Sequence, residues 1–173
     1  MREFAGCRAS HRLGFVAKIL ITGMSGTGKS TALEHLRLRG HTTVDTDTDA
    51  WSRWVRLPDG SSDWIWREQA IGDLLSGHRE GHLFVAGCKS NQGGFYPLFD
   101  QVVLFSAPAD VLLARVAARI TNPYGKRDDE RDAILGHLET VEPLLRATAT
   151  AEIDTTAPVE HVVQRLEELA ARQ

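Results

Sequence analysis

A glycine-rich run near the start of the chain has the residue types and spacing of a phosphate-binding loop. Residues 23–30 read GMSGTGKS, which fits the pattern G-x-x-x-x-G-K-[ST]. Its glycines let successive backbone N–H groups turn toward one point, where they can donate to phosphate oxygens. Lys29 can reach the β- and γ-phosphates of a nucleotide, and the Ser30 hydroxyl can ligate Mg²⁺. We expect the nucleotide to be bound by Gly23, Met24, Ser25, Gly26, Thr27, Gly28, Lys29, Ser30 and Thr31.

The segments on either side of this loop have the patterns of the strand and helix that it needs. Residues 15–22 (FVAKILIT) are mostly apolar and partly β-branched, which is typical of a buried strand. Residues 30–39 carry leucines at positions 33, 36 and 38 and are followed by Gly40, a common residue at a helix C-terminus. The N-terminus of that helix adds positive potential at the loop. This context favours a true phosphate site over a glycine-rich turn that matches by chance.

Three aspartates at alternating positions follow the next predicted strand, residues 40–44. They are Asp45, Asp47 and Asp49. Ligands of an open parallel sheet bind at the carboxyl ends of its strands, so Asp45 is placed to hold Mg²⁺ through water. Asp47 can accept a proton or a hydrogen bond from a substrate hydroxyl. The alternative is that these side chains cap a following helix, with Asp49 as a charge in its first turn.

The rest of the chain alternates predicted strands and helices. We expect strands at residues 82–86, 101–106 and 151–154. We expect a turn at residues 58–62, and helices at residues 48–57, 63–76, 110–120, a span ending near 146, and a last span from 158. This order predicts a three-layer α/β P-loop NTPase fold: a five-stranded parallel sheet with helices on both faces. Residues 15–173 form one domain in this interpretation, and residues 1–14 a flexible N-terminal arm.

Composition excludes several classes of partner. The chain has 173 residues, is 42% hydrophobic and 25% charged, and carries a formal net charge of −3, which favours neither nucleic acid nor an anionic membrane. No apolar run approaches the roughly 20 residues of a membrane helix. Cys7 and Cys88 form no disulfide framework and have no metal-binding spacing. We expect a cytoplasmic monomer or weak homodimer whose partner is a small-molecule phosphoryl acceptor.

Three classes of phosphate-loop protein compete for this sequence. A GTPase needs an Asn-Lys-x-Asp base-reading motif, which the chain lacks. A motor or oligomeric ATPase ends its third strand in acidic residues, whereas residues 84–88 read FVAGC. A small-molecule kinase remains, and it also explains the aspartates.

With the loop and Asp45-Thr46-Asp47 in place, the chain resembles the shikimate kinase branch of the nucleoside monophosphate kinase-like fold. The resemblance implies that Asp45 lies by Mg²⁺ and that Asp47 holds the accepting hydroxyl. It further implies that Arg67, in Trp66-Arg67, binds a substrate carboxylate. It implies nucleotide contacts from Arg115, Thr156 and Pro158, the last two within residues 153–158.

The sequence departs from that family in the acceptor region. The Gly-Gly-Gly that follows the family's third strand is replaced by residues 87–94, GCKSNQGG. We expect Lys89, Asn91 and Gln92 to contact the acceptor, although a polar turn explains the same residues. Arg67 has an alternative too, since its stem can pack along the neighbouring tryptophans with the charge in solvent.

Residues 119–130 have the features of a lid. This segment joins two predicted helices, contains turn residues and supplies the cations Arg119, Lys126 and Arg127. A lid that closes over ATP would bring positive charge to the transferring phosphoryl group. An ordinary helix–helix loop with solvated charges is the alternative.

These residues together predict an ATP- and Mg²⁺-dependent kinase of a small hydroxylated or anionic metabolite. Its expected catalytic residues are Lys29, Asp47, Arg119, Lys126 and Arg127, and its metal ligands Ser30 and Asp45. A nucleoside or nucleotide kinase is the first alternative, and an ATP-binding regulatory protein with little transfer activity is the second.

Overall fold

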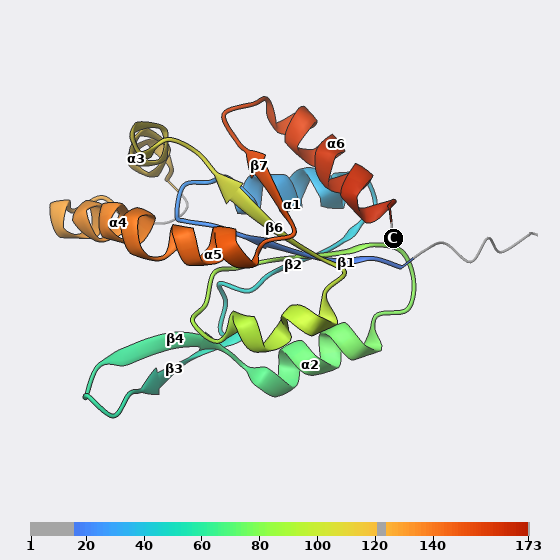
Figure 1. Ribbon diagram of the computed structural model, residues 1–173, viewed down its shortest axis with the longest axis horizontal. Coiled ribbons are helices and arrows are strands. Elements are labelled where there is room, and N and C mark those ends of the chain that lie inside the picture. Colours follow the sequence, from blue (N-terminus) through green and yellow to red (C-terminus); the bar gives the residue numbers. More distant parts are fainter. Residues whose placement is uncertain (1–15, 121–123, 173) are drawn as a thin grey trace, which may run out of the picture.

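The central strands are short apolar segments that pair in parallel, as shown by a computed structural model that describes residues 16–120 and 124–172. The sheet has five strands in the order β2-β5-β1-β6-β7 (Figure 1). They are β1 (Lys18–Thr22), β2 (Thr42–Asp45), β5 (Leu83–Ala86), β6 (Gln101–Ser106) and β7 (Ala151–Asp154). Each strand after β1 is preceded by a connection long enough for a crossover, as parallel pairing requires. The predicted five-stranded parallel sheet is confirmed.

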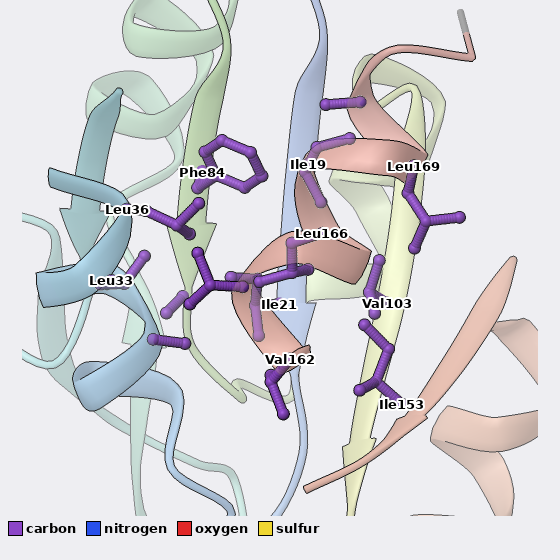
Figure 2. Close-up of a cluster of buried hydrophobic side chains, with 14 of the residues drawn as sticks. Ile19, Ile21, Leu33, Leu36, Phe84, Val103, Ile153, Val162, Leu166 and Leu169 are labelled. Carbon is purple, nitrogen blue, oxygen red and sulfur yellow. The ribbon is translucent and has the colours of Figure 1, made fainter. Parts of the chain in front are cut away.

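Helices cover both faces of this sheet. On one face lie α1 (Lys29–Leu38) and α6 (Val159–Ala170), whose leucines and valines pack on β1, β5, β6 and β7 (Figure 2). On the other face, α2 (Glu68–Gly77) and the 3₁₀ helix η1 (Gln92–Leu98) enclose a second cluster around Trp66 and Leu20. Leu166 is fully buried in α6, so Leu166→Ala should cost about 2–5 kcal/mol of stability.

A third group of helices packs at the end of the sheet near the phosphate-binding loop. It comprises α3 (Ala109–Ala118), α4 (Asp128–Thr140) and α5 (Glu142–Thr148). Leu112 and Leu145 form a small apolar cluster with Met24 of the loop. The predicted single helix that ends near residue 146 is therefore two helices, and Pro143 lies in the first turn of the second.

In the acceptor region one predicted helix, residues 48–57, is wrong, and the helix predicted at residues 63–76 begins only at Glu68. Residues 48–57 and the first part of 63–76 instead form a separate antiparallel hairpin, β3 (Ser52–Arg56) and β4 (Ser62–Trp66). The predicted turn between them is confirmed, and Gly60 adopts φ +86° there. Trp51 and Trp54 have helical spacing, but the pairing of alternating aromatic residues across the hairpin decides the structure.

Two segments singled out in the sequence lie wholly or partly outside the described residues. These are the predicted N-terminal arm, residues 1–14, and residues 121–123 of the predicted lid. Within the described ranges, no helix is both long and apolar enough to cross a membrane.

Candidate nucleotide and acceptor site

The phosphate-binding loop joins the carboxyl end of β1 to the N-terminus of α1, as its sequence predicts. Gly23 has φ +141°, and a Cβ there would lie 2.3 Å from the Phe105 carbonyl oxygen, so no other residue fits without a shift. Thr27 is fully buried and its hydroxyl donates to the Met24 carbonyl at 2.8 Å, which closes the loop. The loop is therefore shaped by its own residues and by contact with β6.

Lys29 lies with its ammonium inside the curve of this loop. Its Nζ donates to the carbonyls of Gly23 at 2.6 Å and Met24 at 3.0 Å. Burial lowers the pKa of Lys29 below its ordinary value of 10.5, while nearby Cys88, Asp47 and Asp45 act in the opposite direction. A phosphate group bound at this position would contact a partly desolvated positive charge.

Ser30 and Asp45 meet at the neighbouring edge of the loop. The Ser30 hydroxyl donates to Asp45 Oδ2 at 2.8 Å, and Asp45 Oδ1 accepts from the Asp47 backbone N–H at 3.0 Å. The register Asp45↔Ala86 places this carboxylate at the carboxyl ends of β2 and β5. Mg²⁺ prefers oxygen ligands such as hydroxyls and carboxylates, so the Ser30–Asp45 pair fits a magnesium site beside bound phosphates.

A cleft of about 1010 Å³ lies in front of the loop and divides into two halves. The loop residues, Arg115, Thr155, Ala157 and Val159 line the nucleotide half. The acceptor half is lined by Asp47, Trp54, Ser62, Asp63, Trp64, Lys89 and Ser90. Residues 153–158 thus reach the cleft through Thr155 and Ala157. Thr156 and Pro158, which were expected to contact the nucleotide, are not among the lining residues.

Asp47 and Lys89 form an ion pair in the acceptor half. Lys89 Nζ donates to Asp47 Oδ1 at 2.5 Å and lies 5.7 Å from the centre of the Trp64 ring. The Lys89 side chain is 8% exposed and that of Asp47 56%, so the carboxylate keeps an open side toward the cleft. The alternative of a helix cap fails for Asp47, because a strand and not a helix follows it.

Three residues predicted to bind the acceptor lie outside the lining of the cleft. Asn91 instead pairs through its amide with the backbone N–H and carbonyl of Trp66, at 3.0 and 3.1 Å. Gln92 is buried and bonds to Thr22 and Tyr96. Arg67 Nε donates to the carbonyls of Asp49 at 2.8 Å and Ser52 at 3.2 Å. These side chains do not line the cleft; their hydrogen bonds hold the segments that form its acceptor half.

Arg115, which was expected to contact the nucleotide, and Arg119 of the predicted lid have different surroundings. Arg115 donates to the Thr155 hydroxyl and carbonyl at 3.1 and 2.6 Å while lining the nucleotide half. Arg119 donates to the Ser25 hydroxyl at 3.2 Å and the Tyr124 carbonyl at 2.8 Å, which brings it against the loop. Burial lowers the pKa of Arg119, and the charge of Asp47 opposes that effect.

Lys126 and Arg127 are held elsewhere in this structure. Lys126 Nζ donates to the carbonyls of Val116 and Arg119 at 2.9 and 2.6 Å, where it satisfies the C-terminus of α3. Arg127 is exposed and pairs with Asp129 at the start of α4. Of the three cations predicted to meet the phosphates, Arg119 alone lines the cleft.

Sequence reasoning missed the hairpin's part in the site. Trp54, Ser62 and Trp64 share one face of the β3–β4 hairpin and line the cleft, and Asp63 between them also reaches it. Asp63, the first residue of the helix predicted at residues 63–76, instead lies in β4 and accepts a hydrogen bond from the Ser90 hydroxyl. The alternation of tryptophan with other residues at 64–66 was the available signal for a strand.

The chain was compared with known families, sequences and structures. The family model described as "AAA domain" matches residues 19–136. No curated protein matches the sequence. Shikimate kinase from Acinetobacter baumannii in complex with shikimate has a TM-score of 0.64 at 19% identity, covering 89% of this chain and 92% of that chain.

Two further solved structures share this arrangement of elements. Shikimate kinase from Bacteroides thetaiotaomicron has a TM-score of 0.63 at 24% identity, covering 88% of this chain and 97% of that chain. A gluconokinase from Sinorhizobium meliloti 1021 has a TM-score of 0.55 at 17% identity, covering 91% of this chain and 93% of that chain. At these identities the likeness establishes a common P-loop fold.

Proposed function

The chain belongs to the family described as an AAA domain, and from this premise we propose that it is an ATP- and Mg²⁺-dependent kinase of a small hydroxylated metabolite. One observation carries the proposal. Lys29, Ser30 and Asp45 stand at the phosphate end of a cleft whose other half presents the open carboxylate of Asp47. Phosphoryl transfer from ATP to a hydroxyl requires its groups in this order.

The proposed reaction uses these residues as follows. The acceptor's hydroxyl oxygen forms a bond to the γ-phosphorus of ATP, and the bond from that phosphorus to the bridging oxygen breaks, with its electron pair going to ADP. Asp47 takes the hydroxyl proton. Lys29 and Arg119 stabilise negative charge on the phosphoryl oxygens. Mg²⁺ held by Ser30 and Asp45 would neutralise further phosphate charge.

The end of β5 favours a kinase over a motor-type ATPase. Ala86 is followed by Gly87 and Cys88, so no carboxylate stands there to polarise water. The fold of the solved kinases supports the same choice. Because ATP and Mg²⁺ are the proposed partners, we also propose a cytosolic location.

The test begins with a thermal-shift screen of hydroxylated metabolites in the presence of Mg²⁺ and a non-hydrolysable ATP analogue, since an acceptor stabilises the closed protein by mass action. Compounds that raise Tm are then assayed for ADP formation. Asp47→Asn should lower kcat by about 10²- to 10⁴-fold with little change in ATP affinity. Asp132→Asn, which removes an exposed carboxylate of α4, serves as the control.

Two results would contradict the proposal. One is the absence of ADP formation above the rate with water for every compound that binds. The other is normal turnover by Asp47→Asn with a selected acceptor. Tight ATP binding together with the first result would favour the regulatory alternative.

A further inference from the structure

The acceptor half of the cleft carries an exposed aromatic surface. Trp54 and Trp64 are direct cross-strand partners, and their ring centres lie 5.2 Å apart with a 47° tilt. Trp54 is 68% exposed although it lines the cleft. A large aromatic side chain left in water at the wall of the cleft is suited to contact with a ligand.

The hairpin that presents these rings is fixed at its base. The Ser52 hydroxyl donates to the Thr46 carbonyl at 2.7 Å, directly before Asp47. The Arg67 contacts with Asp49 and Ser52 tie the same strand to the aspartate segment. The rings therefore stand at a set position relative to Asp47, and contact with them requires no ordering of the hairpin base.

The charges in this half are unsuited to an anionic acceptor. Of the residues assigned to this half, Asp47 and Asp63 are acidic and Lys89 is basic, while Arg119 of the same cleft interacts with the Asp47 charge from the side of the phosphate-binding loop. Lys89 is already engaged by Asp47 and by the face of Trp64, and it is 8% exposed. Arg67, which the shikimate kinase resemblance assigns to a carboxylate, is not part of the lining. Ionised carboxylates accept hydrogen bonds from hydroxyl or amino groups and repel other anions.

We propose that the acceptor is a hydroxylated ring that carries no carboxylate or phosphate group. Its ring lies against Trp54 and Trp64, and its hydroxyl or amino groups donate to Asp47 and Asp63. This inference rests on the proposed kinase function and narrows it. It separates this chain from acceptors such as shikimate and gluconate, which are carboxylates.

The experiment measures phosphoryl transfer from ATP to defined acceptors, with intrinsic tryptophan fluorescence as an independent readout of binding. Neutral hexoses, amino sugars and nucleosides represent the proposed chemistry in separate arms. Shikimate, gluconate and nucleoside monophosphates represent the anionic alternatives. The variants are Trp54→Ala, Trp54→Phe and, as a control, Arg56→Ala, which alters an exposed residue of the same strand outside the cleft lining.

A compound from the first set should be the best acceptor and should quench the fluorescence. Trp54→Ala should raise its KM by about 3- to 10-fold, leaving the KM for ATP unchanged. Trp54→Phe should restore most of the affinity, and Arg56→Ala should behave as the parent protein.

The remaining outcomes separate the two proposals. If an anionic compound is the preferred acceptor, or if Trp54→Ala leaves the KM for the acceptor unchanged, the inference is wrong. The proposed kinase function is unaffected by either result. A neutral ring that quenches the parent but not Trp54→Ala, without being phosphorylated, supports the ring site and contradicts the kinase. If no neutral ring compound binds and none is phosphorylated, the inference is wrong.

Discussion

Replacement of Lys29 by methionine tests the nucleotide site without knowledge of the acceptor. Methionine keeps a long unbranched side chain and removes the charge. Lys29 Nζ donates to the Gly23 and Met24 carbonyls, so contact with phosphate exchanges these bonds for bonds to phosphate oxygens. The net loss then corresponds to about one charge-assisted hydrogen bond, or roughly 1.5–3 kcal/mol. That energy equals an increase in Kd of about 10- to 150-fold.

The assay is titration of each protein with a fluorescent ATP analogue at fixed Mg²⁺ and ionic strength. Arg165→Met is the matched control, because it removes a cation from the exposed face of α6, where Arg165 pairs with Glu168. Its Kd should equal that of the parent. A Kd for Lys29→Met within threefold of the parent, with an unchanged melting temperature, would refute the assigned role of Lys29.

The lowered pKa of Lys29 adds a pH dependence to this prediction. Between the lowered pKa and the ordinary value of 10.5, the unfolded chain holds the proton more than the folded protein does. The stability of the nucleotide-free protein therefore gains from Lys29 as pH rises through that window. Phosphate favours the charged ammonium, so ATP affinity should fall over the same window. In Lys29→Met this part of the fall should be absent.

Four further substitutions test the metal site, α4 with the turn before it, and the histidine directly before β5. Asp45→Asn should raise the Mg²⁺ concentration for half-maximal ATP binding by roughly 10- to 100-fold, measured by Mg²⁺ titration, because a charged oxygen beside Ser30 is lost. Gly125→Ala should cost about 2–4 kcal/mol in urea unfolding, since φ is +89° and the new Cβ would lie 2.1 Å from Val116 Cγ1. Gly136→Ala, in open space within α4, should instead stabilise by about 0.5–1 kcal/mol. Burial, with His41 nearby, lowers the pKa of His82 below 6.5, so stability should fall as pH drops through 6.5 and the unfolded chain takes up the proton. His82→Gln should flatten this dependence in thermal melts at pH 5–8, and an unchanged slope would contradict the assignment.

The three inner strands of the central sheet, β1, β5 and β6, were predictable because they are buried on both faces. A strand such as β6 must be apolar at successive positions, so the run VVLF stands out from the sequence alone. The phosphate-binding loop was predictable for a related reason. Its shape depends on local dihedral angles and on residues within one short segment, as the contact of Thr27 with Met24 illustrates.

The acceptor half was less predictable because its structure depends on pairing across the chain. Ser52–Arg56 has two half-exposed faces, so its pattern is compatible with a helix until β4 is placed beside it. The amide residues after β5 show a second limit. Asn91 and Gln92 are polar and close to Lys89, yet they turn to the backbone of Trp66 and to Thr22. A composition typical of a binding loop does not reveal which side chains are already used within the fold.

The two halves of the cleft are nevertheless joined by one close contact between strand ends. Gly87 follows β5, and a Cβ there would lie 2.1 Å from the Thr46 hydroxyl and 3.3 Å from Trp66 Nε1. Absence of a side chain at this point lets the aspartate segment pack directly against β5 and lets Thr46 donate to the Ala86 carbonyl at 2.8 Å. That approach sets Asp47 within reach of Lys89 and sets the base of the hairpin beside them. The packing of the aspartate segment on β5 thereby sets the position of the hairpin base, and with it the tryptophans, relative to the central sheet and the loop that follows β1.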